Sequence, residues 1–212
     1  MLKLGVMVSG GGTNLQAILD KIDNGYLEGC RVVAVVSSKP GVYALERAGK
    51  YGIPSTCISK KNYEKPEEYD RALIEYFGKY DAGLIVLAGF LSMVGEGFIN
   101  RYRNRIINIH PALIPSFCGK GFYGILPHRK ALEYGVKVTG ATVHFVEPEY
   151  DSGPIILQKA VGVLEDDTAE ILQKRVMEQA EWEILPEAIK LYAEGRLAVE
   201  GRKVRIKNNK GE

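Results

Sequence analysis

The sequence predicts an α/β protein with a doubly wound, mostly parallel sheet, helices on both faces of that sheet, and antiparallel additions in the C-terminal half. Four apolar runs, at residues 2–8, 31–37, 82–88 and 105–110, are nearly continuous in character, as strands buried on both faces are. Helical patterns lie between these runs. Because strands alternate with helices, we expect a parallel sheet with right-handed crossovers.

Two helices in the first half show the 3.6-residue period of an amphipathic helix. Apolar residues recur there at spacings of three and four. The first set is Leu15, Ile18, Leu19 and Ile22, and the second is Tyr69, Ala72, Leu73, Tyr76, Phe77 and Tyr80. Each set predicts one helix that packs its apolar face against the sheet.

The second half of the chain changes character. Residues 138–146 alternate between apolar and polar, like a half-exposed strand, and residues 155–163 predict another strand after a turn at 151–154. A long helix is expected to begin near Asp167, whose side chain is expected to cap it together with Glu170.

Pro186 is expected to kink or restart that helix. Two short apolar runs, 197–199 and 204–206, predict a terminal hairpin around Gly201. There is no internal repeat and no linker-like stretch. We therefore expect residues 1–200 to form a single domain, followed by residues 201–212 as a basic tail or hairpin strand.

The composition is that of a soluble globular protein. Of the 212 residues, 46% are hydrophobic and 25% are charged, and no apolar run approaches the ~20 residues of a membrane helix. Met1 runs directly into a strand-like segment without the features of a signal peptide, which predicts a cytoplasmic protein. The predicted tail carries five basic residues and one acidic residue without interleaved aromatics, so we interpret it as a solvated terminus rather than a nucleic-acid contact.

Cysteine usage excludes two classes of site. Cys30, Cys57 and Cys118 are odd in number and widely spaced, which argues against a disulfide framework and against a zinc site. Cys118 lies in a Gly-rich segment, so a catalytic thiol stays open as a minor alternative.

A Gly-rich loop, Ser9-Gly10-Gly11-Gly12-Thr13-Asn14, connects the first predicted strand to the first predicted helix. Glycines let the backbone approach a ligand, and a helix N-terminus offers free N–H groups to an anion, so the loop favours a phosphate. It lacks the Lys of a Walker A motif and the G-x-G-x-x-G pattern, which disfavours a nucleoside triphosphate or a dinucleotide. The alternative is a plain turn in which Thr13 caps the helix.

A second candidate site lies at the end of the fourth predicted strand, in Asn108-Ile109-His110-Pro111. Residues two apart project from the same face of a strand, so an amide and an imidazole would lie together and suit oxyanion stabilisation and proton transfer. The alternative is a capped strand end with a hydrogen-bonded histidine. His128 is expected to start a surface helix, His144 is a candidate structural partner, and three irregularly spaced histidines predict no metal site.

The turn at residues 147–154 carries three carboxylates. One of them, folding back towards His110, would raise the pKa of that imidazole and orient its ring. The alternative is an ordinary tight connection between two strands.

Together these motifs resemble the folate-dependent glycinamide ribonucleotide formyltransferases of purine synthesis over nearly the whole chain. The resemblance rests on residues 8–16, 86–90, 107–115, 143–146 and 151–158. The pair Asn-x-His-Pro and Asp-x-Gly-Pro-Ile is shared by formyl-folate enzymes generally, and the Gly-rich Thr-Asn loop marks the ribonucleotide branch. The resemblance implies the formyltransferase fold, 10-formyltetrahydrofolate as co-substrate, no metal, and a monomer or homodimer without nucleic-acid or membrane partners.

The resemblance also implies roles for single residues. The catalytic residues would be Asn108, His110 and Asp151. The ribonucleotide would be held by Gly12, Thr13, Asn14 and Glu181. The folate would be held by Leu91, Ser92, Met93, Val94, Asn108, Glu147, Pro148, Glu149, Tyr150 and Asp151.

Two segments depart from the family pattern. A basic folate contact common in the family falls here on Pro66, with Lys65 beside it. The loop Ser116–Gly124 differs from many relatives, and its glycines predict a mobile lid.

Other functions remain open at this point. A formyl-folate hydrolase would use the same catalytic residues on water, but usually carries an additional N-terminal domain. The initiator-tRNA formyltransferase carries an additional C-terminal domain for which the chain length leaves no room. A formyltransferase acting on another phosphorylated amine and a non-catalytic nucleotide-binding module are the remaining alternatives.

Overall fold

The structure is a computed structural model that describes residues 1–208. The chain divides into two compact units, Met1–Asn108 and Ile109–Glu212. The last four residues of the predicted basic tail lie outside the described residues, and the expectation of a single domain over residues 1–200 stays a prediction.

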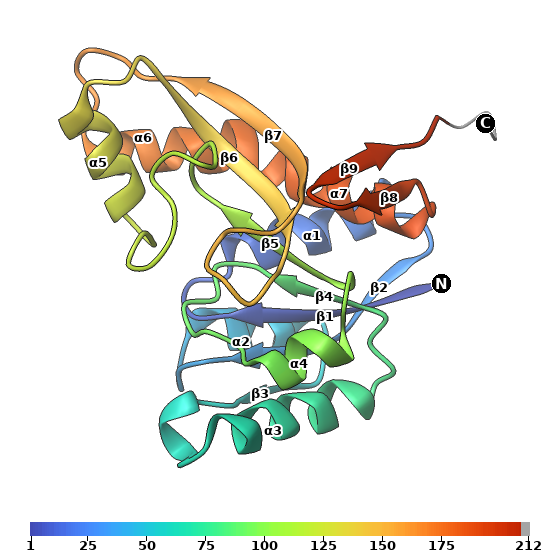
Figure 1. Cartoon of the computed structure of the whole chain (residues 1–212). Helices are drawn as coiled ribbons and strands as arrows, with labels where there is room; N and C mark the ends of the chain where they lie inside the picture. Colours follow the sequence, from blue (N-terminus) through green and yellow to red (C-terminus); the bar gives the residue numbers. More distant parts are fainter. Residues whose placement is uncertain (209–212) are drawn as a thin grey trace. The chain divides into compact units, whose positions relative to one another are not determined.

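The first unit is built on parallel strands in the order β3-β2-β1-β4-β5 (Figure 1). Every neighbouring pair among them is parallel. The strands are β1 (Leu2–Val8), β2 (Cys30–Ser37), β3 (Ser55–Cys57), β4 (Leu84–Leu87) and β5 (Ile106–His110), of which β5 continues into the second unit. The four strands predicted from apolar runs are confirmed, and the short β3 is added to them.

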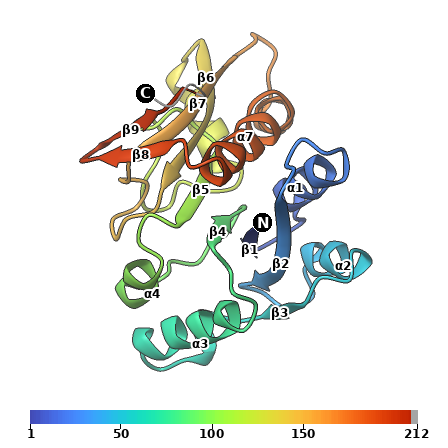
Figure 2. The same cartoon turned by 90° about the vertical axis from the view of Figure 1, so that its right-hand side faces the viewer.

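Helices cover both faces of this sheet. They are α1 (Thr13–Asp23), α2 (Tyr43–Lys50), the 3₁₀ turn η1 (Lys60–Asn62), α3 (Pro66–Gly78) and α4 (Glu96–Arg101). Figure 2 shows α1 and α2 on one face and α3 and α4 on the other. Right-handed crossovers require this division, because the chain proceeds from β1 outwards to β3 and then returns past β1 to β4. The doubly wound arrangement is confirmed.

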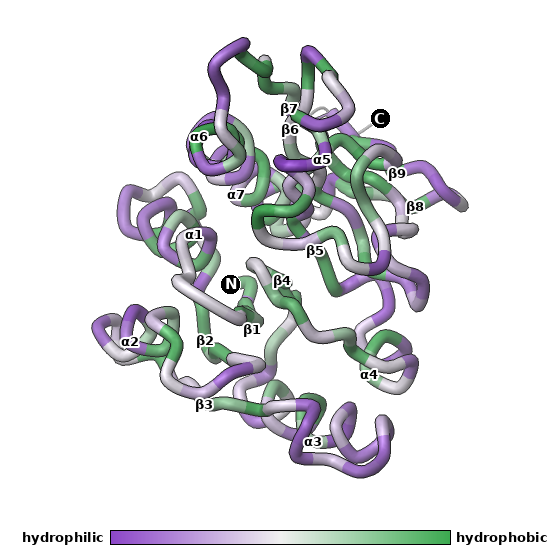
Figure 3. Tube along the Cα trace, turned by 90° about the vertical axis from the view of Figure 1, so that its left-hand side faces the viewer, coloured by the Kyte–Doolittle hydropathy of each residue, from purple (hydrophilic) through white to green (hydrophobic). Residues whose placement is uncertain are grey.

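The packing follows the periodicity of the sequence. Leu15 and Ile18 of α1 and Leu73 and Phe77 of α3 are fully buried. Gly5 of β1 makes room for α3, because a Cβ there would lie 2.6 Å from the Phe77 ring. Figure 3 shows the matching pattern, with hydrophobic colour along β4 and alternating colours along α2 and α3. Within residues 1–208, no helix combines the length and apolarity needed to cross a membrane.

The second unit supplies the antiparallel additions. Its elements are α5 (Leu126–Tyr134), β6 (Val138–Phe145), β7 (Ile155–Gly162), α6 (Ala169–Val176), the π-helical turn η2 (Met177–Glu181), α7 (Trp182–Ala193), β8 (Leu197–Glu200) and β9 (Lys203–Ile206). Strands β6 and β7 are antiparallel, and so are β8 and β9, which confirms the predicted terminal hairpin. Strand β9 joins β7 in parallel.

The predicted cap of the long helix is wrong by one residue. Thr168 is the N-cap of α6, and its hydroxyl accepts a hydrogen bond from the Ile171 N–H. Asp167 instead accepts two hydrogen bonds from the Arg175 guanidinium, at 2.5 and 2.6 Å, and one from the Leu164 N–H. A bidentate guanidinium is a stronger partner for a carboxylate than a single backbone donor, which explains the difference.

The predicted interruption of that helix also lies elsewhere. The break is the π-helical turn η2, upstream of Pro186, and Pro186 itself lies inside α7. Proline cannot donate the backbone hydrogen bond to the residue four positions earlier, which is Trp182 at the start of α7. The helix therefore changes its hydrogen-bond pattern one turn before the proline rather than at it.

Candidate active site

Strand β5 ends with the predicted pair Asn108 and His110. Asn108 closes the first unit and lies opposite Leu87 of β4 in the parallel ladder. His110 belongs to the second unit and is 3% exposed. Pro111 follows and has no N–H to continue the ladder, so β5 ends here as predicted.

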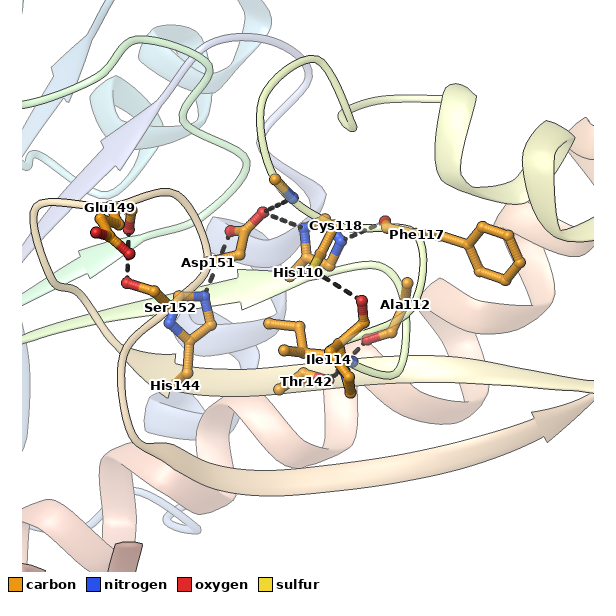
Figure 4. A network of polar contacts seen from close by, with 12 residues as sticks. His110, Ala112, Ile114, Phe117, Cys118, Thr142, His144, Glu149, Asp151 and Ser152 are labelled. Atoms are coloured by element: carbon orange, nitrogen blue, oxygen red, sulfur yellow. Dashed lines mark hydrogen bonds and ion pairs between the residues drawn. The ribbon is translucent and has the colours of Figure 1, made fainter. Parts of the chain in front are cut away.

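Within the second unit, the carboxylate of Asp151 folds back onto His110 (Figure 4). Its Oδ2 lies 3.6 Å from His110 Nδ1, and its Oδ1 lies 3.6 Å from His144 Nε2. The Gly119 N–H donates to Oδ2 at 2.8 Å. Asp151 has a φ of 49°, a left-handed conformation that is unusual for a side chain larger than glycine and is enriched at functional sites. The prediction that a carboxylate of this turn folds back towards His110 is thus confirmed.

Each histidine of this cluster has an oxygen acceptor on both sides of its ring. His110 Nε2 lies 3.0 Å from the carbonyl oxygen of Phe117, and His144 Nδ1 lies 2.8 Å from the carbonyl oxygen of Phe145. A carbonyl only accepts, so these two nitrogens carry hydrogen and the other nitrogen of each ring faces Asp151. His144, a candidate partner in the sequence, therefore shares Asp151 with His110.

Burial decides the direction of the pKa shift of His110 but not that of Asp151. The pKa of His110 is lowered from its ordinary value by burial, although Asp151 and the Phe117 carbonyl oppose that effect. The sequence predicted a raised pKa for His110, and that direction is wrong, because the removal of water outweighs the nearby carboxylate. Burial alone would raise the pKa of Asp151, but the His144 ring, His110 and the Gly119 N–H together hold it below its ordinary value. At neutral pH the resting cluster is a carboxylate beside a mostly neutral His110.

The loop after His110 is fastened to the sheet by polar side chains. The Thr142 hydroxyl donates to the Ala112 carbonyl at 2.7 Å and accepts from the Ile114 N–H at 3.1 Å. Cys118 lies further along this loop, and its thiol contacts the Pro115 carbonyl. Burial and the charge of Asp151 raise the pKa of the Cys118 thiol, so it is a poor source of thiolate and the catalytic-thiol alternative gains no support.

His128 lies in the first turn of α5, as predicted, but its side chain is not on the surface. Its side chain is 1% exposed, and neither ring nitrogen has a hydrogen-bond partner within residues 1–208. Burial and the nearby charge of His110 lower the pKa of His128 to about 4. The sequence pattern around it, Leu126-Pro127-His128-Arg129, gave no sign that a polar residue would face inward.

The Gly-rich loop lies in the first unit between β1 and α1. Gly12 occupies the N-cap of α1 in a left-handed conformation, with a φ of 73°, and the cap has no side-chain hydrogen bond. Thr13 is therefore the first helical residue, and the expectation in the alternative that Thr13 caps the helix is wrong. Gly10 and Gly11 are exposed at the carboxyl end of β1, and Asn14 is buried.

Ser9 connects this loop to the predicted folate segment. Its hydroxyl accepts from the Leu91 N–H at 2.8 Å and bonds to the Ser38 hydroxyl at 2.5 Å. In that segment Leu91 is exposed and Val94 is buried. Within the first unit, Ser9 of the Gly-rich loop is thus hydrogen-bonded to the backbone of Leu91, the first residue of the predicted folate segment.

The other predicted residues take varied positions. Pro66 is the first residue of α3 and Lys65 its N-cap, a placement that suits proline. In the second unit, residues 147–149 line an open pocket of about 360 Å³. Tyr150 is exposed, and Glu181 is buried at the end of η2.

Comparison with known proteins identifies related sequences along most of the chain. A family model described as formyl transferase matches residues 2–189. A phosphoribosylglycinamide formyltransferase from Escherichia coli is 40% identical over 192 residues, which cover 91% of this chain and 87% of that protein. A trifunctional purine biosynthetic protein from Gallus gallus is 42% identical over 200 residues, or 93% of this chain. The chain spans 14–19% of the length of the trifunctional relatives.

Solved structures agree with these relatives. A glycinamide ribonucleotide transformylase 1 from Symbiobacterium toebii has a TM-score of 0.92 and 46% identity, with 98% of this chain and 95% of that chain covered. A formyltetrahydrofolate deformylase from Pseudomonas syringae pv. tomato has a TM-score of 0.86 and 25% identity, with 98% of this chain and 66% of that chain covered. The sequence and the fold therefore lead to the same group of proteins.

Proposed function

The chain belongs to the formyl transferase family, and on this premise we propose that it transfers the formyl group of 10-formyltetrahydrofolate to the amine of glycinamide ribonucleotide in purine biosynthesis. The observation that carries the proposal is the placement of Asp151 3.6 Å from the buried His110, at the end of the strand that also bears Asn108. A nucleotide-binding module has no use for that arrangement. Both proposed substrates are small soluble molecules, which fits the predicted cytoplasmic location.

Asn108 and His110 are the proposed oxyanion donors. When the substrate amine attacks the formyl carbon, the formyl oxygen gains negative charge, and a well-placed donor to such an oxygen contributes about 3–4 kcal/mol. His110 Nε2 is bonded to the Phe117 carbonyl here. The formyl oxygen would take the place of that carbonyl on Nε2.

The ionisation of His110 suits this role. A mostly neutral imidazole does not bind the uncharged formyl group strongly, but the developing oxyanion adds its negative charge to that of Asp151. The proton affinity of the ring then rises as the transition state forms. The interaction is strongest where catalysis needs it.

Asp151 is the proposed proton carrier. Its lowered pKa keeps it as a carboxylate at neutral pH, ready to accept a proton. Through a water molecule it would take the proton from the attacking amine and deliver it to the departing folate nitrogen. His144 and the Gly119 N–H hold the carboxylate in place for this exchange.

The remaining roles concern binding. Gly12, Thr13 and Asn14 would hold the ribonucleotide phosphate at the N-terminus of α1, and the buried Glu181 would accept from the ribose hydroxyls. The folate would be held by residues 91–94 and 147–151. Lys65 would replace the basic contact that Pro66 cannot make.

The test is a formyl-transfer assay with purified protein, 10-formyltetrahydrofolate and glycinamide ribonucleotide. Formylated ribonucleotide should accumulate together with tetrahydrofolate, in equal amounts, and only when both substrates are present. The absence of transfer to glycinamide ribonucleotide would contradict the proposal, and transfer to another phosphorylated amine in its place would assign a different acceptor.

A hydrolase is the second candidate, because the deformylase from Pseudomonas syringae shares the fold and 25% of the aligned residues. Formate release without the ribonucleotide, at a rate similar to that of transfer with it, would support this function instead.

A further inference from the structure

Helix α2 binds the Gly-rich loop through Arg47. The guanidinium Nε donates to the Gly11 carbonyl at 2.8 Å, and Nη1 donates to the Gln16 side-chain oxygen at 2.8 Å. The group also lies over the Tyr43 ring, 4.8 Å from its centroid, which restricts its motion. One side chain therefore joins the loop to the first turns of α1. Figure 3 shows α1 and α2 on the same side of β1 and β2.

A second contact from α2 fixes the neighbouring peptide. The Ala44 N–H donates to the Gly10 carbonyl at 3.2 Å. At Gly12, a Cβ would lie 2.7 Å from the Ala44 Cβ, and the φ of 73° also disfavours any other residue. The loop thus lies so close to α2 that only glycine fits at this position.

These two contacts determine where the loop presents its amides. In a trans peptide the C=O and the N–H of the next residue point in opposite directions. Since the carbonyls of Gly10 and Gly11 point to α2, the N–H groups of Gly11 and Gly12 point away from it. Two successive amides on one side of a loop at a helix N-terminus form a concave anion site.

We infer that Arg47 is a positioning residue for the substrate phosphate: it holds the Gly11 carbonyl so that the loop amides are directed at the phosphate before the substrate arrives. The inference rests on the proposed function, because it takes the loop to be the phosphate site. Arg47 contributes to ribonucleotide binding through the loop, and its guanidinium is engaged by Gly11 and Gln16 rather than by the ligand.

The experiment compares Arg47→Ala and Arg47→Lys with the control Lys50→Ala. Lys50 lies on the same helix, and its ammonium contacts the Tyr43 hydroxyl at 3.2 Å and the same ring at 5.3 Å. The control removes an equal charge from α2. The readouts are kcat, the KM for each substrate and the melting temperature.

Loss of a charged hydrogen bond that orders the site predicts a rise on the order of tenfold or more in the ribonucleotide KM of Arg47→Ala. The formyl-folate KM and kcat should stay within about twofold, Arg47→Lys should recover part of the affinity, and Lys50→Ala should match the wild type. An unchanged ribonucleotide KM, or an equal rise in both KM values, would overturn the inference.

A binding measurement separates this inference from the proposed function. Ribose 5-phosphate carries the phosphate without the amine, and calorimetry should show that the wild type binds it and that Arg47→Ala binds it more weakly by a similar factor. A wild type that binds ribose 5-phosphate but transfers no formyl group leaves the positioning role intact and ends the proposed function. If the wild type and Arg47→Ala bind ribose 5-phosphate equally well, or if neither binds it, the positioning role of Arg47 is refuted.

Discussion

Replacing Asp151 by Asn removes a charge from the candidate active site and hardly changes its shape. The amide oxygen can still accept from the Gly119 N–H, so the turn between β6 and β7 should keep its conformation. What is lost is the negative charge 3.6 Å from His110 and 3.6 Å from His144. Folding stability should change little compared with activity.

The distance sets the size of the expected effect. Two unit charges 3.6 Å apart interact by about 4–5 kcal/mol at the effective dielectric constant of ~20 that suits protein sites. This is the most that Asp151 can contribute to an imidazolium forming at His110. Since each ~1.4 kcal/mol is a factor of ten in rate, kcat should fall by up to about 10³-fold.

The pH dependence gives the sign of the effect. Asp151 opposes the burial that lowers the pKa of His110, so the Asn variant should have a His110 pKa that is lower still. The ratio of protonated His110 in the two proteins is then largest above both pKa values and shrinks as the pH falls through them. Acid should therefore restore part of the lost activity, but not all, because the proton carrier is also gone.

The assay is turnover against pH, together with NMR titration of the His110 ring in both proteins. The control is Asp166→Asn, which removes an exposed carboxylate of the second unit. If the His110 ring titrates identically in the wild type and in Asp151→Asn, Asp151 does not act on it electrostatically and the reasoning fails.

Three further predictions concern single side chains. His110→Ala should lower kcat by on the order of 10²–10³-fold while both KM values stay within a few-fold, because the side chain acts on charge that appears in the transition state; near-normal turnover would contradict its role. Asn14→Ala should weaken ribonucleotide binding in calorimetry by on the order of tenfold without affecting folate binding, and the opposite pattern would contradict the phosphate loop. Because the pKa of His128 is lowered to about 4, the unfolded chain binds more protons than the folded protein between pH 6.5 and 4, and folding stability should fall by on the order of 3 kcal/mol as the pH falls through that range. His128→Leu should remove this part of the pH dependence of the urea midpoint, and an unchanged profile would show that His128 is not its source.

The parts of the fold that the sequence predicts are those with a strong local signal. Nearly continuous apolar runs predict the strands β1, β2, β4 and β5. Long apolar side chains at helical spacing predict the helices α1 and α3. Helix α2 was not predicted from the sequence, because its buried residues are Ala44 and Ala48, whose small side chains give little periodic signal. Since α2 was not predicted, the contact of its Arg47 with the Gly-rich loop was not predicted either.

The candidate site shows a different limit. Local pattern placed Asn108 and His110 on one strand, and the resemblance supplied Asp151 from a distant turn. The direction of the His110 pKa depends on how completely the folded chain removes water, which depends on many distant residues and cannot be derived from the motif. The burial of the His128 side chain could not be predicted either, because it also depends on residues that are distant in the sequence.

Formyl transfer through His110 is tested most directly by a single-turnover experiment with 10-formyltetrahydrofolate and glycinamide ribonucleotide. Transfer by the wild type and by His110→Ala is followed at saturating concentrations of both substrates. We expect stoichiometric formylation of the ribonucleotide by the wild type, and a transfer step on the order of 10²–10³-fold slower in the variant with both substrates still bound. Transfer at the wild-type rate in the variant, or formate release in place of formylated ribonucleotide in the wild type, would contradict this expectation.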